Sequence, residues 1–246
     1  MMGDVAEDSL VMRGRRLWEG LAGVDGAAFP EVGGVRVVVS PGSGFCPPGW
    51  VGVVVLEGAA LVTVPAPGLV AAVERAVSGA PPDAWTLRTA LRAADVLGPA
   101  ALAYLPDGGL RPAGGHVDKV AADHPGLRAL LAAVGPEDAD EAGLDALDSP
   151  AFVVRDGDGS VAAAAGYHRW PSATAHLCVL THPRHRGRGL ARRVASAAVA
   201  HASAEGRWPQ WRARPAASRR VADALGFREI GWQLSLRPAV EPAAGY

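Results

Sequence analysis

The part of the sequence that most restricts the fold is residues 174–206, where strand character changes to helix character across a short basic loop. The apolar run Thr174–Thr181 predicts a strand. From Leu190 onward, apolar residues recur at helical spacing until Gly206, which marks the end of the helix. Between the two lies the loop Arg184–Gly189, with three arginines and two glycines. This order brings the backbone N–H groups of a helix N-terminus to a strand end.

The segment before this strand predicts a β-hairpin. Residues 151–155 and 160–170 are apolar runs joined by the sequence Asp-Gly-Asp-Gly, a strong turn signal. The first polar residues of the turn also have the spacing of the first ligand positions of a calcium-binding loop. The positions where such a loop requires Gly and Glu hold Val161 and Tyr167, so we expect no metal there.

Strand and helix signals continue to the end of the chain. Residues 208–214 predict a strand that ends at Pro215, and residues 228–236 predict a last strand. Between them, Ser218 is the expected N-cap of a helix that ends at Gly226. Before the hairpin, residues 125–147 predict an acidic helical segment. We interpret it as a solvated face, with a lid that attracts substrate as the alternative.

The loop has the properties of an anion-binding site. Gly187 and Gly189 permit positive φ angles and a close approach of the backbone to a ligand. A helix N-terminus adds free N–H groups and a partial positive charge. Ten arginines and a single acidic residue lie between Arg184 and Arg220, although the whole chain has a net charge of −1. This concentration of guanidinium groups suits a ligand with several phosphate charges.

Three other phosphate-binding patterns compare poorly with this loop. A P-loop requires Gly-Lys-Ser/Thr, whereas Leu190 and Ala191 follow the second glycine. A dinucleotide-binding fingerprint requires a third glycine where the chain has Arg192. A nucleic-acid-binding arm stays open as an alternative. The regular apolar spacing from Leu190 to Ala198 argues against it, so we do not expect a nucleic-acid partner.

Composition indicates a soluble cytoplasmic protein. The chain is 49% hydrophobic and 20% charged, and its longest apolar stretch, residues 51–64, is interrupted by glycines and Glu57. We therefore expect no membrane-spanning segment and no signal peptide. The two cysteines lie far apart, and Cys178 sits in an apolar run that is typical of a buried, inert thiol.

The N-terminal half contains a weak internal repeat of the C-terminal half. Residues 94–98 resemble residues 222–226, and residues 61–77 repeat the order of strand, glycine and helix found around the basic loop. The first copy has no arginine where the loop would be. We therefore predict a degenerate or accessory domain at residues 1–113 and a ligand-binding domain at residues 116–240, with chance similarity as the alternative.

Two motifs resemble those of a known family. His182–Ala191 closely resembles the acetyl-coenzyme A loop of the GNAT acetyltransferase superfamily, with the pattern Gln/Arg-x-x-Gly-x-Gly/Ala. Ala217–Phe227 resembles the closing helix of that family and its Leu-Gly-Phe end. The two motifs occur in the family's order and together are far more specific than either alone. The resemblance extends from about Ala151 to Pro238.

The resemblance implies a fold and a donor. The expected fold is α/β, of the α+β type, with a mixed, mostly antiparallel central sheet flanked by helices, in one copy or in tandem. The strand before the loop would separate from the next strand and admit acetyl-coenzyme A as co-substrate. The residues that the resemblance assigns to donor binding are Val179, Leu180, Thr181, Arg184, Arg186, Gly187, Arg188, Gly189, Leu190 and Ala191.

The catalytic residues depart from the family pattern. Many relatives have a tyrosine on the closing helix, where this chain has Ala222. Ser218 is the nearest hydroxyl and our candidate acid, although an N-cap role competes. His176 is the candidate base on the strand before the loop, with a structural histidine as the alternative. His168 and Tyr167 are further candidates.

The resemblance therefore supports two functions. The first is N-acetyltransfer to a small-molecule amine or a protein amino group, with a cationic acceptor favoured if the acidic stretch near Glu137 and Asp140 lines the site. The second is an acyl-coenzyme A-binding sensor with little or no turnover. Trp208 and Trp211 are assigned to the core, with an interface such as that of a homodimer as the alternative.

Overall fold

The computed structural model describes residues 2–77 and 83–239. The described residues form two compact units, one made of those up to residue 102 and from residue 230 onward and the other of residues 103–229. The chain passes between them within strand β4 (Asp95–Tyr104) and again within strand β10 (Arg228–Arg237). Within the described residues, no helix is both long and apolar enough to cross a membrane.

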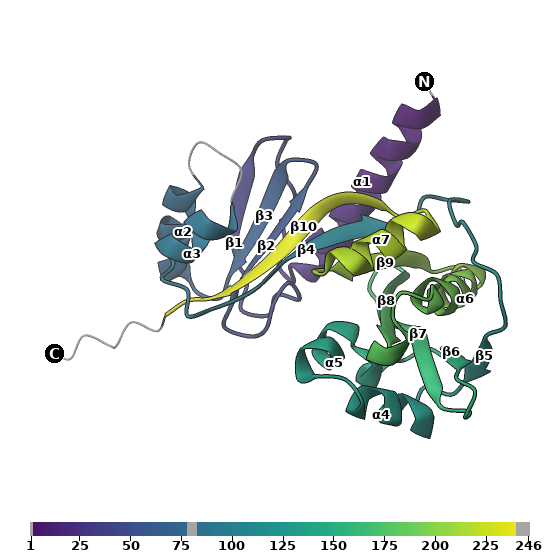
Figure 1. Cartoon of the computed structure of the whole chain (residues 1–246). Helices are drawn as coiled ribbons and strands as arrows, with labels where there is room; N and C mark the ends of the chain where they lie inside the picture. The colour runs from purple at the N-terminus through teal and green to yellow at the C-terminus, as the bar shows by residue number, and fades with distance from the viewer. Residues whose placement is uncertain (1, 78–82, 240–246) are drawn as a thin grey trace. The chain divides into compact units, whose positions relative to one another are not determined.

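The first unit is a sheet with helices against it. Its strands follow the order β1-β3-β2-β10-β4, in which β1 is parallel to β3 and β2 is antiparallel to both of its neighbours. Strands β2 and β3 are buried along their whole length, and α2 and α3 pack onto the same core (Figure 1). Its other elements are α1 (Met2–Leu21), β1 (Val35–Val39), β2 (Val51–Leu56), β3 (Ala59–Val64), η1 (Pro67–Leu69), α2 (Val70–Ala76) and α3 (Ala84–Ala90).

The second unit contains the hairpin, the basic loop and the closing helix. Its strands follow the order β9-β8-β7-β6-β5, with the end of β4 beside β9. Only β8 and β9 are parallel among the registers described for this unit, and the other pairs are antiparallel. Its elements are β5 (Asp118–Val120), α4 (Pro125–Ala132), α5 (Pro136–Ala142), η2 (Leu144–Ala146), β6 (Ala151–Arg155), β7 (Val161–Trp170), β8 (Thr174–Thr181), η3 (Pro183–His185), α6 (Leu190–Ala204), β9 (Trp208–Ala213) and α7 (Ala216–Leu225).

Helices cover both faces of this sheet. Side chains alternate along β8, so Leu177 joins the core under α6 and α7, whereas Cys178 joins the core under α4 and η2. Burial raises the pKa of the Cys178 thiol to about 12, which keeps it protonated and inert. Trp208 and Trp211 are each 3% exposed and belong to the core of the unit. The predicted α/β class, with a mixed and mostly antiparallel sheet flanked by helices, is confirmed.

The N-terminal elements differ in part from the expected repeat. The strand, glycine and helix predicted over residues 61–77 correspond to β3, η1 and α2. Residues 85–87 lie inside α3, because the Asp83 side chain accepts hydrogen bonds from the N–H groups of Trp85 and Thr86 and starts the helix there. Residues 95–98, compared with a helix, begin strand β4. The repeat therefore stays a prediction.

The observed units also differ from the domain boundary expected at Gly114-Gly115. Residues 103–113 belong with the second unit, and residues from 230 onward belong with the first. The reason is pairing, because β10 extends into the first unit beside β2. Residue 240, the expected end of the second domain, lies outside the described residues.

Two glycines that follow helices allow a matched test of this packing. Gly206 after α6 and Gly226 at the end of α7 have φ angles of 69° and 98°. The residue after each glycine donates back to the helix, Arg207 to the Ala202 carbonyl and Phe227 to the Ala222 carbonyl. A Cβ on Gly206 would meet open space, whereas one on Gly226 would overlap the Gly109 carbonyl oxygen.

We therefore expect Gly206→Ala to lower the free energy of unfolding by about 1 kcal/mol, the cost of a left-handed non-glycine residue. Gly226→Ala should lower it by about 3 kcal/mol or more, because backbone atoms must also move. Urea denaturation of the two variants checks this difference. Equal losses would contradict the close approach of Gly109 and α7.

Candidate functional site

The parallel ladder between β8 and β9 is short and then opens. Thr174, Ala175 and His176 pair with residues 208–210, and among the described residues no further pair between β8 and β9 follows. Both strands nevertheless continue, β8 to Thr181 and β9 to Ala213. The second unit therefore has a gap in its sheet at the C-terminal end of β8, directly before the basic loop.

The backbone of β8 presents hydrogen-bonding groups to this gap. The N–H and C=O of one strand residue point to the same side, and the side alternates with each residue. On the side of β8 that faces β9, Trp208 N donates to Ala173 O. On the side that faces β7, His182 N donates to Ala162 O. Because the register between β7 and β8 is continuous, odd-numbered residues face β9. Val179 and Thr181 therefore present their amide groups to the gap.

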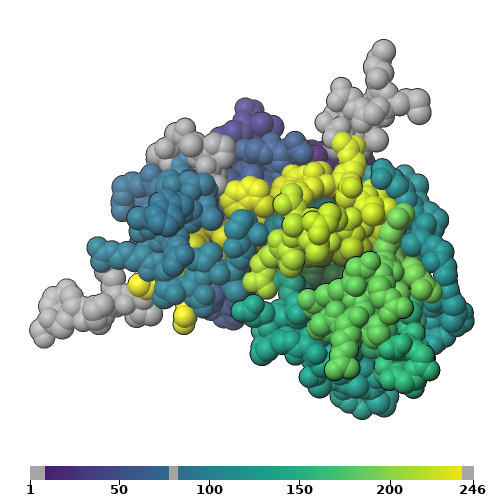
Figure 2. Space-filling view, in the orientation of Figure 1, coloured from purple at the N-terminus to yellow at the C-terminus, as the bar shows by residue number. Residues whose placement is uncertain are grey.

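A cavity of about 520 Å³ occupies the gap and continues to the loop. Its walls come from β8, the loop and first turn of α6, the end of β9, α7 and α5. In Figure 2, α7 and the segment of the loop and α6 lie side by side on the visible face of this unit. The predicted donor-binding residues that line the cavity are Val179, Leu180, Thr181, Arg186, Gly187, Gly189, Leu190 and Ala191.

The loop has the backbone conformation that its glycines predict. Gly187 and Gly189 have φ angles of 76° and 73°, and the space beside each Cα is open. Gly189 precedes α6 and supplies no side-chain cap. Among the described residues, no acceptor is found for the N–H groups of residues 187–192. The loop and the helix N-terminus therefore offer a row of free donors to the cavity.

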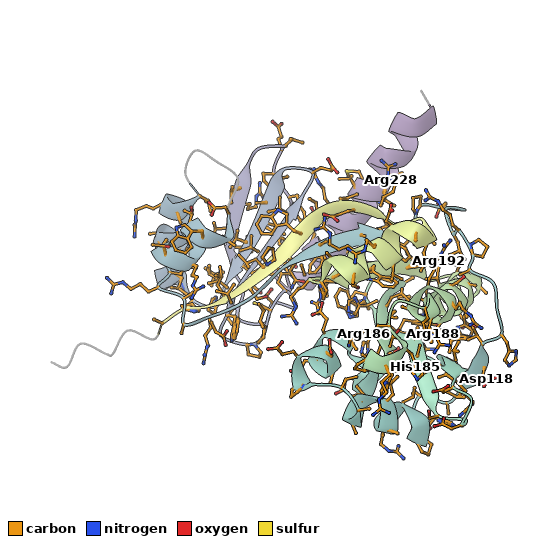
Figure 3. The ribbon with its side chains drawn as sticks, in the orientation of Figure 1. Asp118, His185, Arg186, Arg188, Arg192 and Arg228 are labelled. Carbon is orange, nitrogen blue, oxygen red and sulfur yellow. The ribbon has the colours of Figure 1, made fainter. Side chains whose placement is uncertain are left out.

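Side chains of the loop are held by neighbours. Arg188 Nη1 lies 3.0 Å from His185 Nδ1, and His185 Nε2 lies 2.9 Å from Asp156 Oδ2 in the hairpin turn. Figure 3 shows His185, Arg186 and Arg188 gathered at this point. Arg184 and Arg188, both assigned to donor binding by the resemblance, are not among the residues that line the cavity.

Three arginines that the sequence analysis did not single out also line the cavity: Arg192, Arg212 and Arg220. The Arg192 Nε atom is buried and has no hydrogen-bond partner among the described residues. A helical pattern in the sequence could have indicated the α7 wall, because Ala217, Val221 and Ala224 recur on one face.

Two carboxylates of α5 complete the lining. Asp138 and Glu141, one helical turn apart, both line the cavity, whereas Glu137 and Asp140 are exposed and do not line it. Asp138 Oδ2 lies 2.7 Å from Arg186 Nη2. The acidic stretch near Glu137 and Asp140 thus borders the cavity through Asp138 and Glu141, because the start of α5 at Pro136 sets which residues point inward.

Ser218 lines the cavity, but it is not the N-cap that the sequence predicts. Helix α7 starts at Ala216 with Pro215 as its N-cap, so Ser218 lies in the first turn. Proline suits this position because its carbonyl accepts helical bonds, from the N–H groups of Ser218 and Arg219, and it has no N–H to satisfy. The Ser218 Oγ accepts a hydrogen bond of 3.0 Å from Trp211 Nε1. Its own hydroxyl hydrogen is not used in this bond.

His176, the candidate base, lies in the sheet beyond the closed end of the gap. It is 9% exposed, is not among the cavity-lining residues, and stacks on Trp170 with ring centroids 4.2 Å apart. Its Nδ1 lies 2.5 Å from Gln210 Oε1. Burial, followed by the charge of Arg212, lowers the pKa of His176 from 6.5 to about 3. The structure therefore favours a structural histidine.

The weaker candidates are also occupied within the protein. His168 Nε2 lies 3.1 Å from the Gly143 carbonyl oxygen, and Tyr167 OH lies 3.1 Å from His201 Nδ1. Neither residue lines the cavity. In the part of the chain that the structure describes, no group of three or more His, Cys, Asp or Glu side chains could hold a metal ion.

Comparisons with known proteins agree with the motifs. Residues 151–231 match the family model of the GNAT acetyltransferase, so this part of the chain is a GNAT acetyltransferase domain and the predicted resemblance is confirmed there. A search of the curated proteins found no match.

Several solved structures are similar to the chain. A GNAT-family protein of Novosphingobium aromaticivorans is 27% identical, with a TM-score of 0.47 over 59% of this chain and 66% of that chain. A GNAT-family acetyltransferase of Colwellia psychrerythraea is 17% identical, with a TM-score of 0.46 over 64% of this chain and 62% of that one. The chain thus spans slightly less than two thirds of these two proteins. A phosphinothricin acetyltransferase of Sinorhizobium meliloti, solved with acetyl-coenzyme A, is 17% identical, with a TM-score of 0.37 over 53% of this chain and 94% of that one.

The buried His176 makes stability depend on pH. Its pKa of about 3 in the folded state is below its ordinary value of 6.5, so the unfolded chain binds a proton more readily. This contribution is fully present above pH 6.5 and is lost as the pH falls toward 3. Between pH 6.5 and about 4.5, we expect it to lower the free energy of unfolding by about 2 kcal/mol.

A His176→Gln variant should lack this component, so the difference in stability between wild type and variant should shrink by that amount over the same range. Urea denaturation at a series of pH values measures it. Parallel pH profiles for the two proteins would contradict a neutral, buried His176.

Proposed function

We propose that the GNAT acetyltransferase domain at residues 151–231 transfers the acetyl group of acetyl-coenzyme A to a primary amine. The observation that carries this proposal is the continuity of one cavity from the gap between β8 and β9 to the N-terminus of α6. An open strand edge suits an arm that contains amides, and a helix N-terminus suits a diphosphate. The donor has both groups, joined end to end.

The residues present fit the donor at both ends. The free N–H groups of residues 187–191 would hold the diphosphate, and the open space beside Gly187 and Gly189 lets phosphate oxygens approach the backbone. The amide groups of Val179 and Thr181 would bind the pantetheine arm. The cavity volume of about 520 Å³ also lies within the range of ~300–1,000 Å³ that is typical of ligand pockets.

The proposed reaction is a direct attack. The acceptor nitrogen forms a bond to the thioester carbonyl carbon, the carbon–sulfur bond breaks, and the electron pair leaves with the sulfur. The nitrogen loses one proton and the thiolate gains one. Binding both reactants in one cavity removes much of the entropic barrier to their encounter.

Ser218 is the residue we assign to the thiolate. Trp211 Nε1 donates to its Oγ at 3.0 Å, and an indole N–H can only donate. The Ser218 hydroxyl hydrogen therefore stays available for an acceptor in the cavity. The first turn of α7 adds the positive end of a helix, which favours a developing negative charge on sulfur.

The acceptor we propose is a cationic amine, either a small molecule or an amino group of a protein. Asp138 and Glu141 place two carboxylates on the cavity wall, Asp138 beside Arg186 of the loop. Carboxylates there attract an ammonium group and raise its local concentration.

The alternative is an acyl-coenzyme A-binding module without turnover. This alternative is supported by Ala222, which stands where many relatives have the tyrosine acid and is only 3% exposed. Both functions require the donor site, and they differ only in whether thiol is released.

The test is release of free coenzyme A thiol from acetyl-coenzyme A across a panel of mono-, di- and polyamines. We expect release that depends on the amine. Ser218→Ala should lower kcat about 100-fold, the range of general acid catalysis, with donor affinity changed less than about twofold. Ser203→Ala, an exposed serine of α6, is the matched control and should keep full activity.

A second variant, Gly187→Glu, should abolish donor binding, because a side chain at φ 76° is strained and its carboxylate would meet the diphosphate. Circular dichroism checks that it folds. Donor binding by the wild type without thiol release for any amine would favour the sensor, and absence of donor binding would refute both functions.

A further inference from the structure

One ion pair joins α5 to the donor loop across the mouth of the cavity. Arg186 Nη2 lies 2.7 Å from Asp138 Oδ2, and the two side chains are 50% and 47% exposed. Both residues line the cavity. Arg186 Nε also donates to the Thr181 carbonyl oxygen at 3.4 Å, which holds the guanidinium at the end of β8. Figure 3 shows Arg186 at this point.

We infer that Asp138 is an internal competitor for the donor phosphates, which occupies Arg186 until acyl-coenzyme A takes its place. This inference rests on the proposed function, because it assumes a diphosphate in the loop. A guanidinium binds a phosphate with the same forked geometry as a carboxylate, so the two ligands exclude each other at one pair of N–H groups. The diphosphate has the larger charge and the free N–H groups of the loop beside it.

The exposure of the pair makes the exchange easy. Half-exposed ion pairs contribute little to stability, since solvent screens both charges. Asp138 can therefore hold Arg186 in place in the free protein and release it at small cost. Once Arg186 binds phosphate, the Asp138 carboxylate is left in the cavity without that partner.

Glu141 on the same helix provides the contrast. Its carboxylate accepts from Arg214 twice, from Nε at 2.6 Å and from the backbone N–H at 3.1 Å, and it is only 26% exposed. Arg214 is not among the residues that line the cavity. Glu141 therefore anchors α5 to the end of β9, whereas Asp138 is bound to a residue of the donor site.

The test is the affinity for coenzyme A, measured by isothermal titration at low ionic strength. Asp138→Asn removes the competing charge and keeps the shape of the side chain, so it should tighten binding about two- to fivefold, the range for an exposed pair. Glu137→Gln, the matched control at an exposed position of the same helix that does not line the cavity, should change the affinity by less than about 1.5-fold.

A double-variant cycle distinguishes an effect of the Asp138–Arg186 pair from a general effect of removing negative charge from the cavity. In an Arg186→Gln background, which itself weakens binding, Asp138→Asn should have no further effect. The gain should also shrink as salt is raised. Thermal melting of each variant checks that it is folded.

Two results would overturn the inference alone: coenzyme A binding that Asp138→Asn leaves unchanged or weakens, or a gain that persists without Arg186. No binding of coenzyme A by the wild type would overturn the proposed function together with the inference. The two failures are therefore distinguishable.

Discussion

The separation of β8 and β9 beyond the His176–Gln210 pair is the constraint on which the rest of the site depends. A continuous sheet would bond the amide groups of Val179 and Thr181 to a neighbouring strand and leave no room between them. Because the strands part, those amide groups face a cavity. The same cavity ends at the glycine loop and the N-terminus of α6. Strand edge and helix end thus act as one site, with the buried His176 and Trp170 stack at the closed end of the gap.

Two carboxylates offset part of the positive charge of this site. The chain as a whole has a net charge of −1, yet the segment from Arg184 to Arg220 is strongly basic. Helix α5 brings acidic residues from outside that segment, and Asp138 and Glu141 pair with Arg186 and Arg214. The free protein is therefore less positive at the cavity than its arginine content indicates. A ligand with phosphates would change this balance, since it competes for the guanidinium groups while the carboxylates stay in place.

The sequence predicts the elements of the second unit well, because their signals are local. Gly206 and Gly226 end helices through their own φ angles, and Pro183 and Pro215 limit strands through their missing N–H. Prediction is less accurate where the first residue of a helix has to be placed to within one or two positions. Pro215, rather than Ser218, caps α7. The start of α5 at Pro136 determines that Asp138 and Glu141 of the acidic stretch line the cavity. The end of the β8–β9 ladder depends on residues far apart in the sequence, so no local pattern could locate it.

Binding of the donor at the loop and along β8 is the central claim, and amide chemical shifts of the isotope-labelled protein during a titration with coenzyme A test it most directly. We expect saturable shifts of the amide signals of Gly187, Gly189 and Leu190, together with those of Val179 and Thr181. Shifts confined to the loop would support binding of the diphosphate there but not binding of the donor along β8. Signals that stay unchanged in both segments at saturating coenzyme A would contradict the account.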